Sequence, residues 1–289
     1  MRVVTRACEL GTVDGVRSRA VVMTMGALHE GHLALVRHAR ATADEVVVTI
    51  FVNPLQFNDP ADLERYPRTL DADCRLLEAE GVDVVYAPSD AEVYPGGAPI
   101  VTVSAGAIND VFEGAARPGH FDGVLTIVLK LLHLTRPHTA VFGAKDAQQV
   151  IAVQTMVRDF NLPVQIAVAP TVRDDDGLAK SSRNVFLSPP QRTDALVLSR
   201  ALLAADAAAG SGAAVPEVLA AGMTVLDSAP AVAVEYFAAL HPVSAQPVAE
   251  DYRGEIVIAV AAQVGATRLI DNVTTRIGNS DAAHQGGTL

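Results

Sequence analysis

The chain has 289 residues, of which half are hydrophobic, and its 22 basic and 33 acidic side chains give a net charge of −11. This length fits one large domain or two ordinary ones. The acidic balance argues against a nucleic-acid surface, which needs a basic footprint. The two cysteines, Cys8 and Cys74, are too few for a disulfide framework or a zinc site, so we expect a reducing cytoplasm. The sequence has no apolar leader and no run as long as a membrane span, which predicts no membrane association.

Through residue 171, short apolar runs alternate with longer segments of helical periodicity. The expected strands are 20–23, 45–52, 82–86, 100–103, 140–142 and 164–168. The expected helices are 33–43, 69–80, 123–135 and 148–160, with Thr69 capping the second. The run at 45–52 is almost continuously apolar and β-branched, as in a parallel strand buried on both faces. This alternation predicts an α/β domain over residues 1–171, with a parallel sheet covered by helices on both faces.

The pattern changes after residue 171. Long helices are expected at 189–209, where Pro189 opens an alanine-rich segment, and at 216–228. Strands are expected at 232–240, 255–264 and 267–270, and the polar residues from about 278 are expected to fray. Residues 172–289 are therefore predicted to form a smaller α+β domain.

One stretch in the first domain, residues 23–32 (MTMGALHEGH), has the features of a ligand site. It joins an apolar strand to a helix, and an open α/β sheet binds its ligand at the carboxyl ends of its strands. Backbone N–H groups at a helix start can hold phosphate, and Gly26 and Gly31 permit a close approach of the backbone. His29 and His32 share one face of the first helical turn. Two other interpretations remain open: a histidine that only caps the helix, or a metal pair, although no third ligand lies nearby.

A second polar stretch, Lys180-Ser181-Ser182-Arg183-Asn184, lies near the expected domain boundary. Lysine can contact a phosphate as a point charge, and arginine can bind its oxygens in a bidentate manner. On its own the stretch fits a solvated polar loop better than a phosphate site, and the preceding residues 174–176 (DDD) are expected to form a solvated turn. Together with His29 and His32 it resembles the second half of a nucleotidyltransferase site of the class I tRNA synthetase type.

Further motifs make the resemblance more specific. In chain order they are residues 24–32, 51–57 (FVNPLQF), 66–69 (YPRT), 117–121 (RPGHF), Gly143-x-Lys145-Asp146-x-Gln148-Gln149, 181–184 (SSRN) and 268–272 (RLIDN). Together they resemble the pantothenate synthetase (pantoate–β-alanine ligase) family, over nearly the whole chain.

The resemblance implies an enzyme that condenses (R)-pantoate with β-alanine. ATP would first convert the pantoate carboxylate into an acyl adenylate with release of pyrophosphate, and the amine of β-alanine would then displace AMP. The resemblance also implies a Rossmann-like doubly wound domain, a smaller C-terminal lid domain and a cytoplasmic homodimer. Because the implied partners are the small molecules pantoate, β-alanine and ATP, no nucleic-acid or membrane partner is expected.

The resemblance also implies roles for individual residues. The implied ATP contacts are Met25, Gly26, Ala27, Leu28, His29, Glu30, Gly31, His32, Gly143, Ala144, Lys145, Asp146, Val172, Lys180, Ser181, Ser182 and Arg183. The implied catalytic groups are His32, His29 and Lys145, with His32 donating a proton to the leaving group. The implied substrate contacts are Gln56, Gln149, Asn53 and Arg117. No metal site of the protein's own is expected: Mg²⁺ would arrive with ATP, with Asp73 or Asp146 as outer contacts.

The sequence departs from the family pattern around Lys145. Ala144 stands where the family has glutamate and Ala147 where it has an aromatic residue, and Lys180 replaces a hydrophobic residue. Without the carboxylate, Lys145 would be less firmly oriented. Two alternatives therefore stay open beside the family's reaction: an enzyme that adenylates another acid, and a weakened homologue that only binds nucleotide.

Overall fold

The computed structural model describes residues 1–11, 18–57 and 60–278. The residues divide into two compact units. Unit 1 contains the chain up to Ala144 together with Gln148–Val172, and unit 2 contains Lys145–Ala147 together with the chain from Arg173 onward. The fraying predicted from about residue 278 falls almost entirely outside the described residues. No helix within the described residues is both long and apolar enough to cross a membrane.

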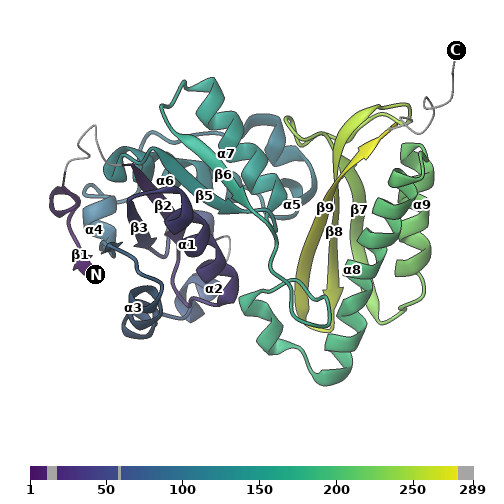
Figure 1. The fold of residues 1–289 in the computed structure, drawn as a ribbon, viewed down its shortest axis with the longest axis horizontal. Coiled ribbons are helices and arrows are strands. Elements are labelled where there is room, and N and C mark those ends of the chain that lie inside the picture. The colour runs from purple at the N-terminus through teal and green to yellow at the C-terminus, as the bar shows by residue number, and fades with distance from the viewer. Residues whose placement is uncertain (12–17, 58–59, 279–289) are drawn as a thin grey trace, which may run out of the picture. The chain divides into compact units, whose positions relative to one another are not determined.

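Unit 1 is built on a six-stranded sheet (Figure 1). Its strands are β1 (Arg2–Val4), β2 (Arg19–Thr24), β3 (Glu45–Ile50), β4 (Val84–Tyr86), β5 (Thr139–Gly143) and β6 (Gln165–Ala169). The strand order is β1-β4-β3-β2-β5-β6, and each pair of neighbours is parallel. The prediction of an α/β fold with a Rossmann-like parallel sheet is confirmed.

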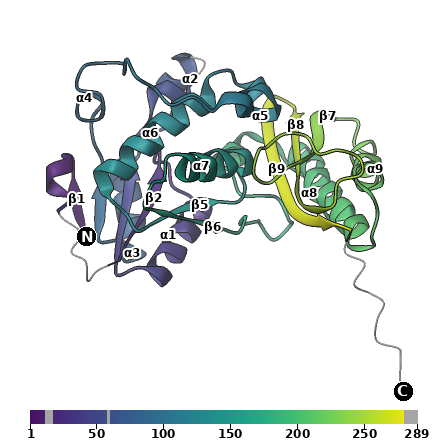
Figure 2. The same cartoon turned by 90° about the horizontal axis from the view of Figure 1, so that it is seen from above.

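Helices cover both faces of this sheet. The helices are α1 (Glu30–Thr42), α2 (Pro60–Arg65), α3 (Leu70–Ala79), α4 (Asp90–Val93), α5 (Phe112–Ala116), α6 (His120–Thr135) and α7 (Ala147–Asp159). Short 3₁₀ helices are η1 (Ala7–Glu9), η2 (Pro54–Gln56) and η3 (Gly106–Asp110). Figure 2 shows α1 and α3 on one side of the strands and α6 on the other. Side chains alternate between the two faces of a strand. On one face of β2, Ala20 and Val22 pack with Val36 of α1, and Val21, which points to the other face, is also fully buried. Both faces of β2 are therefore apolar and covered.

The strand order changes direction between β2 and β5. From β2 the chain moves outward through β3 to β4, and it then returns to place β5 on the other side of β2. In doubly wound sheets the ligand crevice forms at the carboxyl ends of the two strands on either side of such a reversal. Here these ends are Thr24 of β2 and Gly143 of β5, which are the strands that lead into two of the predicted ligand-binding stretches.

A buried arginine anchors the opposite end of β2. Arg19 is 2% exposed, and its Nε donates to Glu45 Oε2 at 2.7 Å. Its two terminal nitrogens donate to the carbonyl oxygens of Thr135 and Leu10. Because every nitrogen of the guanidinium has a partner, the buried charge is compensated and ties β2 to three other segments.

Unit 2 contains a three-stranded antiparallel sheet and two long helices. The order is β7 (Val232–Leu240), β8 (Gly254–Val264) and β9 (Thr267–Ile277), with α8 (Pro189–Gly210), α9 (Val215–Leu226) and the 3₁₀ helix η4 (Ser182–Phe186). Leu198 and Leu202 of α8 pack on Ile256 and Ile258 of β8 within one apolar core. The prediction of a smaller α+β unit is confirmed.

Some boundaries differ from those expected. The strand expected at residues 100–103 is absent, and Ile100 is fully exposed. This apolar run does not form a strand because it does not pair with any strand of the sheet. Strand β3 ends at Ile50, two residues early, whereas β9 continues to Ile277, seven residues beyond the expected end. The sequence of this extension is polar and alternating. It forms a strand because it pairs with β8 along its whole length.

Candidate functional site

The turn between β2 and α1 is held by one buried carboxylate. Asp73 is 2% exposed, and it accepts hydrogen bonds from the backbone N–H groups of Ala27 (3.0 Å) and Leu28 (2.9 Å) and from the hydroxyl of Thr69 (3.0 Å). Thr69 therefore does not cap α3 with its side chain, as the sequence suggested, but orients Asp73. Three donors converging on a carboxylate make a rigid brace for the turn.

The backbone of this turn needs residues that tolerate positive φ. Gly26 has a φ of +81°, and Ala27 has a φ of +50°. A Cβ atom on Gly26 would lie 3.1 Å from Asp73 Oδ2 and 3.2 Å from Ile50 Cγ2. Gly26 is therefore required by both conformation and space, and the hydrogen bonds to Asp73 offset the strain at Ala27.

The two histidines cap α1 with their own rings. His29 is the N-cap residue, and its Nδ1 accepts from the N–H of Gly31 at 3.1 Å. The Nδ1 of His32 accepts from the N–H of His29 at 3.3 Å, and the two ring centroids lie 4.1 Å apart. A ring nitrogen that accepts a hydrogen bond carries no proton, so each neutral imidazole holds its proton on Nε2. The capping interpretation is confirmed, and it leaves each ring as an Nε2–H donor.

This arrangement changes the expected mode of phosphate binding. Five backbone N–H groups of the turn donate within the protein. The N–H of Gly26 bonds to Thr24, and those of Ala27 and Leu28 bond to Asp73. The N–H of His29 bonds to His32, and that of Gly31 bonds to His29. The expectation that these N–H groups are available to phosphate is therefore wrong. A phosphate at this turn would instead be recognised by the Nε2–H groups of His29 and His32, at the positive end of the α1 dipole.

A negative side chain at the same helix start is neutralised. Glu30 begins α1, and its carboxylate pairs with Arg37, which lies two turns further along the same face of the helix. Arg37 also donates to both carboxylate oxygens of Glu80, and these hydrogen bonds, first to Glu80 and then to Glu30, raise the pKa of Arg37 above its ordinary value. Glu30 therefore adds little repulsion toward an anion near the histidines.

The predicted substrate residues after β3 have different roles. Asn53 is 1% exposed, and its Oδ1 accepts from the Tyr94 hydroxyl at 2.8 Å, while its Nδ2 donates to Gly123 O at 3.1 Å and to Gln56 Oε1 at 3.2 Å. Burial raises the pKa of Tyr94, which keeps this hydroxyl protonated as a donor. Because its polar atoms are occupied, Asn53 is placed to orient Gln56. Gln56 is half-buried, and among the described residues its Nε2 donates to the weak acceptor Met25 Sδ at 3.0 Å.

His120 joins two of the predicted motifs. Its Nδ1 lies 2.9 Å from the carbonyl oxygen of Gln56, and its Nε2 lies 3.1 Å from Arg117 Nη1. A carbonyl can only accept and a guanidinium can only donate, so the proton of His120 is on Nδ1. His120 therefore fixes the backbone of Gln56 and holds Arg117 at the start of α6.

Two adjacent glutamines of α7 differ sharply. Gln148 is 5% exposed, accepts from Glu113 N and donates to the carbonyl oxygens of Ile108 and Val111, so it stabilises the segment around η3. Gln149 is half-buried, and no hydrogen bond of the described residues uses its side chain. The amide of Gln149 can therefore bind a ligand, as the sequence predicted, although its ligand stays a prediction.

A glycine on α6 sets the position of η2. A Cβ on Gly123 would lie 2.3 Å from Leu55 O and 2.9 Å from Gln56 N. We expect Gly123→Ala to displace η2, to lower the free energy of unfolding by about 1–3 kcal/mol and to raise the KM for the substrate that Gln56 is predicted to contact. Urea unfolding and steady-state kinetics measure both effects. Gly210→Ala at the end of α8, where a Cβ meets nothing within 4 Å, is the control; equal behaviour of the two variants would contradict the prediction.

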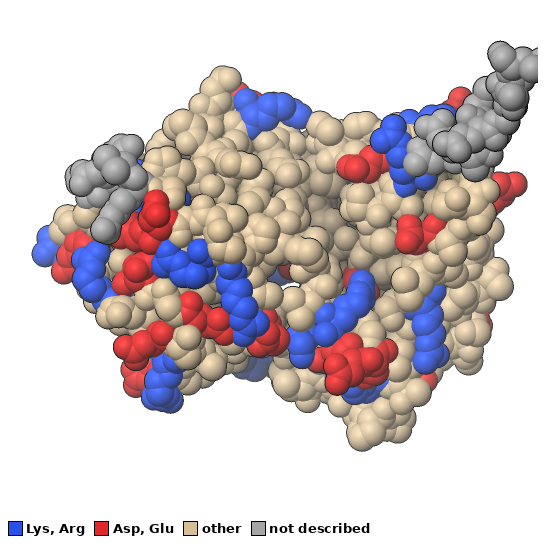
Figure 3. All heavy atoms as spheres, in the orientation of Figure 1, with Lys and Arg blue, Asp and Glu red and all other residues tan. Residues whose placement is uncertain are grey.

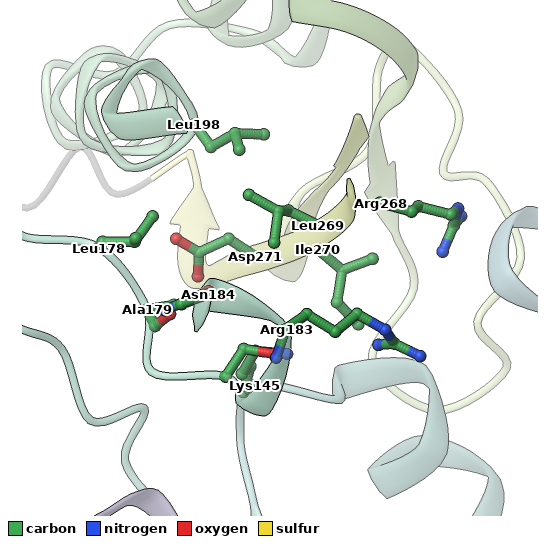
Figure 4. A pocket seen from close by; sticks show the side chains of 11 residues that line it. Lys145, Leu178, Ala179, Arg183, Asn184, Leu198, Arg268, Leu269, Ile270 and Asp271 are labelled. Carbon is green, nitrogen blue, oxygen red and sulfur yellow. The ribbon is translucent and has the colours of Figure 1, made fainter. Parts of the chain in front are cut away.

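Unit 2 contains a pocket of its own (Figure 4). It is lined by Lys145, Ser181, Arg183 and Arg268 together with Leu178, Ala179, Asn184, Leu198, Leu269, Ile270 and Asp271. Lys145, Arg183 and the Ser181 hydroxyl are groups that can bind anionic oxygens. Arg268 pairs with Glu235 at 2.8 Å, and Asp271 adds a carboxylate to the lining. Sequence reasoning identified Lys145, Ser181 and Arg183, and it missed the roles of Arg268 and Asp271, although both belong to the quoted motif at 268–272.

The residues before this pocket form an ion-pair cluster. Asp174 pairs with Lys180 and also with Arg192 (2.8 Å), which pairs in turn with Asp176 (2.9 Å). Hydrogen bonds from Lys180 and then from Arg192 lower the pKa of Asp174. The prediction of a solvated acidic turn is confirmed for Asp175 and Asp176, which are exposed and lie in a turn, whereas Asp174 is half-buried and ion-paired. Lys180 was predicted to bind ATP, but its ammonium group forms an ion pair with Asp174.

Asp73 and Asp146 are the carboxylates for which the sequence suggested a contact to Mg²⁺. The described residues contain no group of three or more His, Cys, Asp or Glu side chains placed to hold a metal ion. Asp73 does not fit the outer metal contact that was expected of it, because it is buried and its carboxylate already accepts three hydrogen bonds. Asp146 is exposed and fits an outer contact to a metal carried by a ligand.

The predicted residues fall into two groups. Unit 1 contains Met25–His32, Asn53, Gln56, Arg117, Gly143, Ala144, Gln149 and Val172, and unit 2 contains Lys145, Asp146 and Lys180–Arg183. The face of the described residues in Figure 3 intersperses acidic and basic side chains and has no continuous basic surface. Together the sheet reversal and the capped histidines define an α/β protein of the nucleotide-binding class.

Comparisons with known proteins make this class specific. The chain matches the sequence pattern of the pantoate-beta-alanine ligase family over residues 3–274, and it belongs to that family. It is 53% identical to a pantothenate synthetase of Paenarthrobacter aurescens, over 92% of this chain and 95% of that one. The solved pantothenate synthetase of Thermus thermophilus superposes with a TM-score of 0.87 at 46% identity, covering 94% and 99% of the two chains.

A third relative was solved with ligands. The pantoate-beta-alanine ligase of Francisella tularensis, complexed with beta-gamma ATP and beta-alanine, has a TM-score of 0.75 and 33% identity, and the match covers 94% of this chain and 97% of that one. The family resemblance seen in the sequence motifs is thereby confirmed, including its placement among the ligases.

Proposed function

We propose that this protein condenses (R)-pantoate with β-alanine to give pantothenate, using ATP and releasing AMP and pyrophosphate. The observation that carries the proposal is the pair of capped imidazoles at the β2–α1 turn of a chain in this family. His29 and His32 each hold an Nε2–H donor at a positive helix end, which suits a polyphosphate whose charge shifts during reaction. The ligands of the Francisella tularensis relative support ATP and β-alanine as substrates.

The first chemical step is an in-line displacement at the α-phosphate of ATP. A pantoate carboxylate oxygen forms a bond to that phosphorus while the bond to the pyrophosphate oxygen breaks, so negative charge grows on the leaving pyrophosphate. We assign His32 Nε2–H as a hydrogen-bond donor to this leaving group, with His29 and Lys145 stabilising the charge. His32 does not transfer its proton as the resemblance implied, because its Nδ1 accepts from His29 N–H and a neutral imidazole keeps its remaining proton. Positioning and electrostatic stabilisation carry the catalysis, because the protein forms no covalent intermediate.

In the second step the neutral amine of β-alanine attacks the acyl carbon of the adenylate. The new C–N bond forms, the C–O bond to AMP breaks, and the proton of the amine passes to solvent water. We assign the pantoate hydroxyls and carboxylate to Gln56 and Gln149, because an amide both donates and accepts. Arg117 is assigned to substrate binding, and Asn53 to the orientation of Gln56.

The remaining assignments concern ATP and the assembly. The main chain of Gly143 and Val172 is assigned to the adenosine, and Ser181, Ser182 and Arg183 to the phosphates. Residues 1–171 are proposed as the ATP- and pantoate-binding domain and residues 172–289 as a lid. Mg²⁺ is proposed to arrive with ATP, and the protein is proposed to act as a cytoplasmic homodimer.

Isotope exchange tests the proposed reaction. Labelled pyrophosphate should enter ATP only when pantoate is present, and AMP should appear only when β-alanine is added as well. Exchange supported equally by other carboxylic acids would identify a different adenylating enzyme. ATP binding without exchange under any acid would identify a nucleotide-binding homologue, which the alanines at 144 and 147 make a definite alternative.

Substitution of Gln149 tests the pantoate assignment. We expect Gln149→Ala to raise the KM for pantoate about tenfold and to leave the KM for ATP within about twofold, because the lost amide contacts only pantoate. Gln154→Ala is the matched control, since Gln154 is exposed on the same helix. A larger change in the KM for ATP than in the KM for pantoate would show that Gln149 contacts ATP and not pantoate.

A further inference from the structure

Two consecutive residues of β9, Asp271 and Asn272, hold two separate parts of the unit 2 pocket. Both are almost fully buried, at 4% and 7% exposed. Consecutive side chains of a strand point to opposite faces of the sheet, so one short segment can hold groups on both sides. Neither residue was assigned a role in the proposed reaction, although both belong to the motif at 268–272.

Asp271 fixes the segment that leads to the Ser181–Arg183 stretch. Its Oδ2 and Oδ1 accept from Arg173 Nη1 (2.6 Å) and Nη2 (3.0 Å) in a bidentate pair. Arg173 Nη1 also donates to Gly177 O at 3.1 Å, inside a hairpin whose base is the antiparallel bridge between Arg173 and Ala179. The pair therefore locks the hairpin that ends directly before Lys180 and Ser181.

The far end of the same stretch is also tied down. Asn184 Nδ2 donates to Ala179 O at 3.0 Å, which closes residues 179–184 into a loop. Ser181 Oγ accepts from the N–H of Arg183 at 3.3 Å and begins η4. The position of Ser181 and Arg183 is thus determined by the hairpin, and through Arg173 by Asp271.

Asn272 fixes Lys145. Its Nδ2 donates to the carbonyl oxygen of Lys145 at 2.7 Å, and its own N–H donates to Asp271 Oδ1 at 2.8 Å. Oδ1 of Asp271 therefore binds both Arg173 and the backbone of Asn272. The two anchors are mechanically linked, and Figure 4 shows Lys145, Arg183 and Asp271 around one cavity.

We propose that Asp271 and Asn272 are positioning residues that set Lys145 and the Ser181–Arg183 segment at the spacing needed to bind one polyphosphate. The inference rests on the proposed function, which assigns those groups to phosphate. Asn272 fixes the backbone of Lys145, because the carbonyl oxygen of Lys145 is anchored from β9.

The test uses the full chain and pantoate-dependent pyrophosphate–ATP exchange. We expect Asp271→Asn, Arg173→Gln and Asn272→Asp each to slow exchange by about tenfold to a hundredfold, the scale for misplaced contacts, with the KM for pantoate within about twofold. Asn272→Asp preserves size but offers no donor to the Lys145 carbonyl. The double variant of Asp271 and Arg173 should be no slower than the slower single variant, because both remove one interaction. Arg173→Lys should recover part of the rate.

Asp159→Asn, which breaks an exposed ion pair with Arg158, is the control and should leave exchange unchanged. Two results would overturn the inference. A lower melting temperature with exchange like that of the control would reduce Asp271 and Asn272 to structural residues, as would additive effects in the double variant. If Asp271→Asn does not fold, Asn272→Asp and Arg173→Lys decide the question alone. Failure of the proposed function is distinct, because the unmodified chain would then show no pantoate-dependent exchange.

Discussion

Replacement of His32 by alanine is expected to slow pantoate-dependent adenylate formation by about a hundredfold or more, the scale for losing one donor to developing charge. The structure gives the reason in the hydrogen bond from His29 N–H to His32 Nδ1, which keeps the His32 proton on Nε2. Alanine removes the Nε2–H donor and leaves the N–H of His29 without its acceptor. Single-turnover formation of the adenylate measures the effect without interference from product release.

Two further variants separate chemistry from helix capping. His29→Asn preserves a good N-cap acceptor and removes an imidazole donor, so its effect on rate reports on chemistry rather than on the helix start. His38→Ala, on the same helix and outside the assigned site, should leave the rate unchanged. A loss below about tenfold for His32→Ala, with ATP affinity intact, would make His32 a capping residue only.

The fold could be predicted from the sequence because its signals are local. The apolar run of β3 and the helical spacing of Leu33, Val36 and Ala39 each identify an element without knowledge of its partners. Their alternation then restricts the sheet to a parallel one. The failure at residues 100–103 has the same origin, because local apolarity cannot show whether a sheet edge is available to pair.

The site was predictable only in part because its contacts are distant in sequence. The motif at 24–32 identified the two histidines, but the acceptor for Ala27 and Leu28 is Asp73, more than forty residues away. Nothing in the local sequence distinguishes Gln148 from Gln149, although the side-chain amide of Gln148 is hydrogen-bonded to the backbone of Glu113 and Ile108. The sequence therefore indicates residue types that suit a phosphate, whereas the structure shows which of their atoms already have partners within the protein.

The brace on the β2–α1 turn leads to the second large effect. Asp73→Asn should lower the free energy of unfolding by about 2 kcal/mol, the scale for leaving a buried donor unsatisfied, and should raise the KM for ATP about tenfold. Asp73 accepts from Ala27 N–H on one oxygen and from Leu28 N–H on the other. The amide group of asparagine has one oxygen and one NH₂, so one backbone N–H would face another donor. The hydroxyl of Thr69 can rotate to accept from the NH₂ group, but a backbone N–H cannot.

The consequence for ATP follows from the geometry of the turn. Without its second hydrogen bond, the positive φ of Ala27 is no longer offset, and the start of α1 that carries His29 and His32 loses its fixed position. Asp71→Asn, an exposed acid in the same first turn of α3, is the matched control and should change stability by less than about 1 kcal/mol, because it loses only its interaction with the helix dipole. Urea unfolding and ATP kinetics on both variants decide the matter. If Asp73→Asn lowers stability but leaves the KM for ATP unchanged, the turn does not need this brace to bind nucleotide.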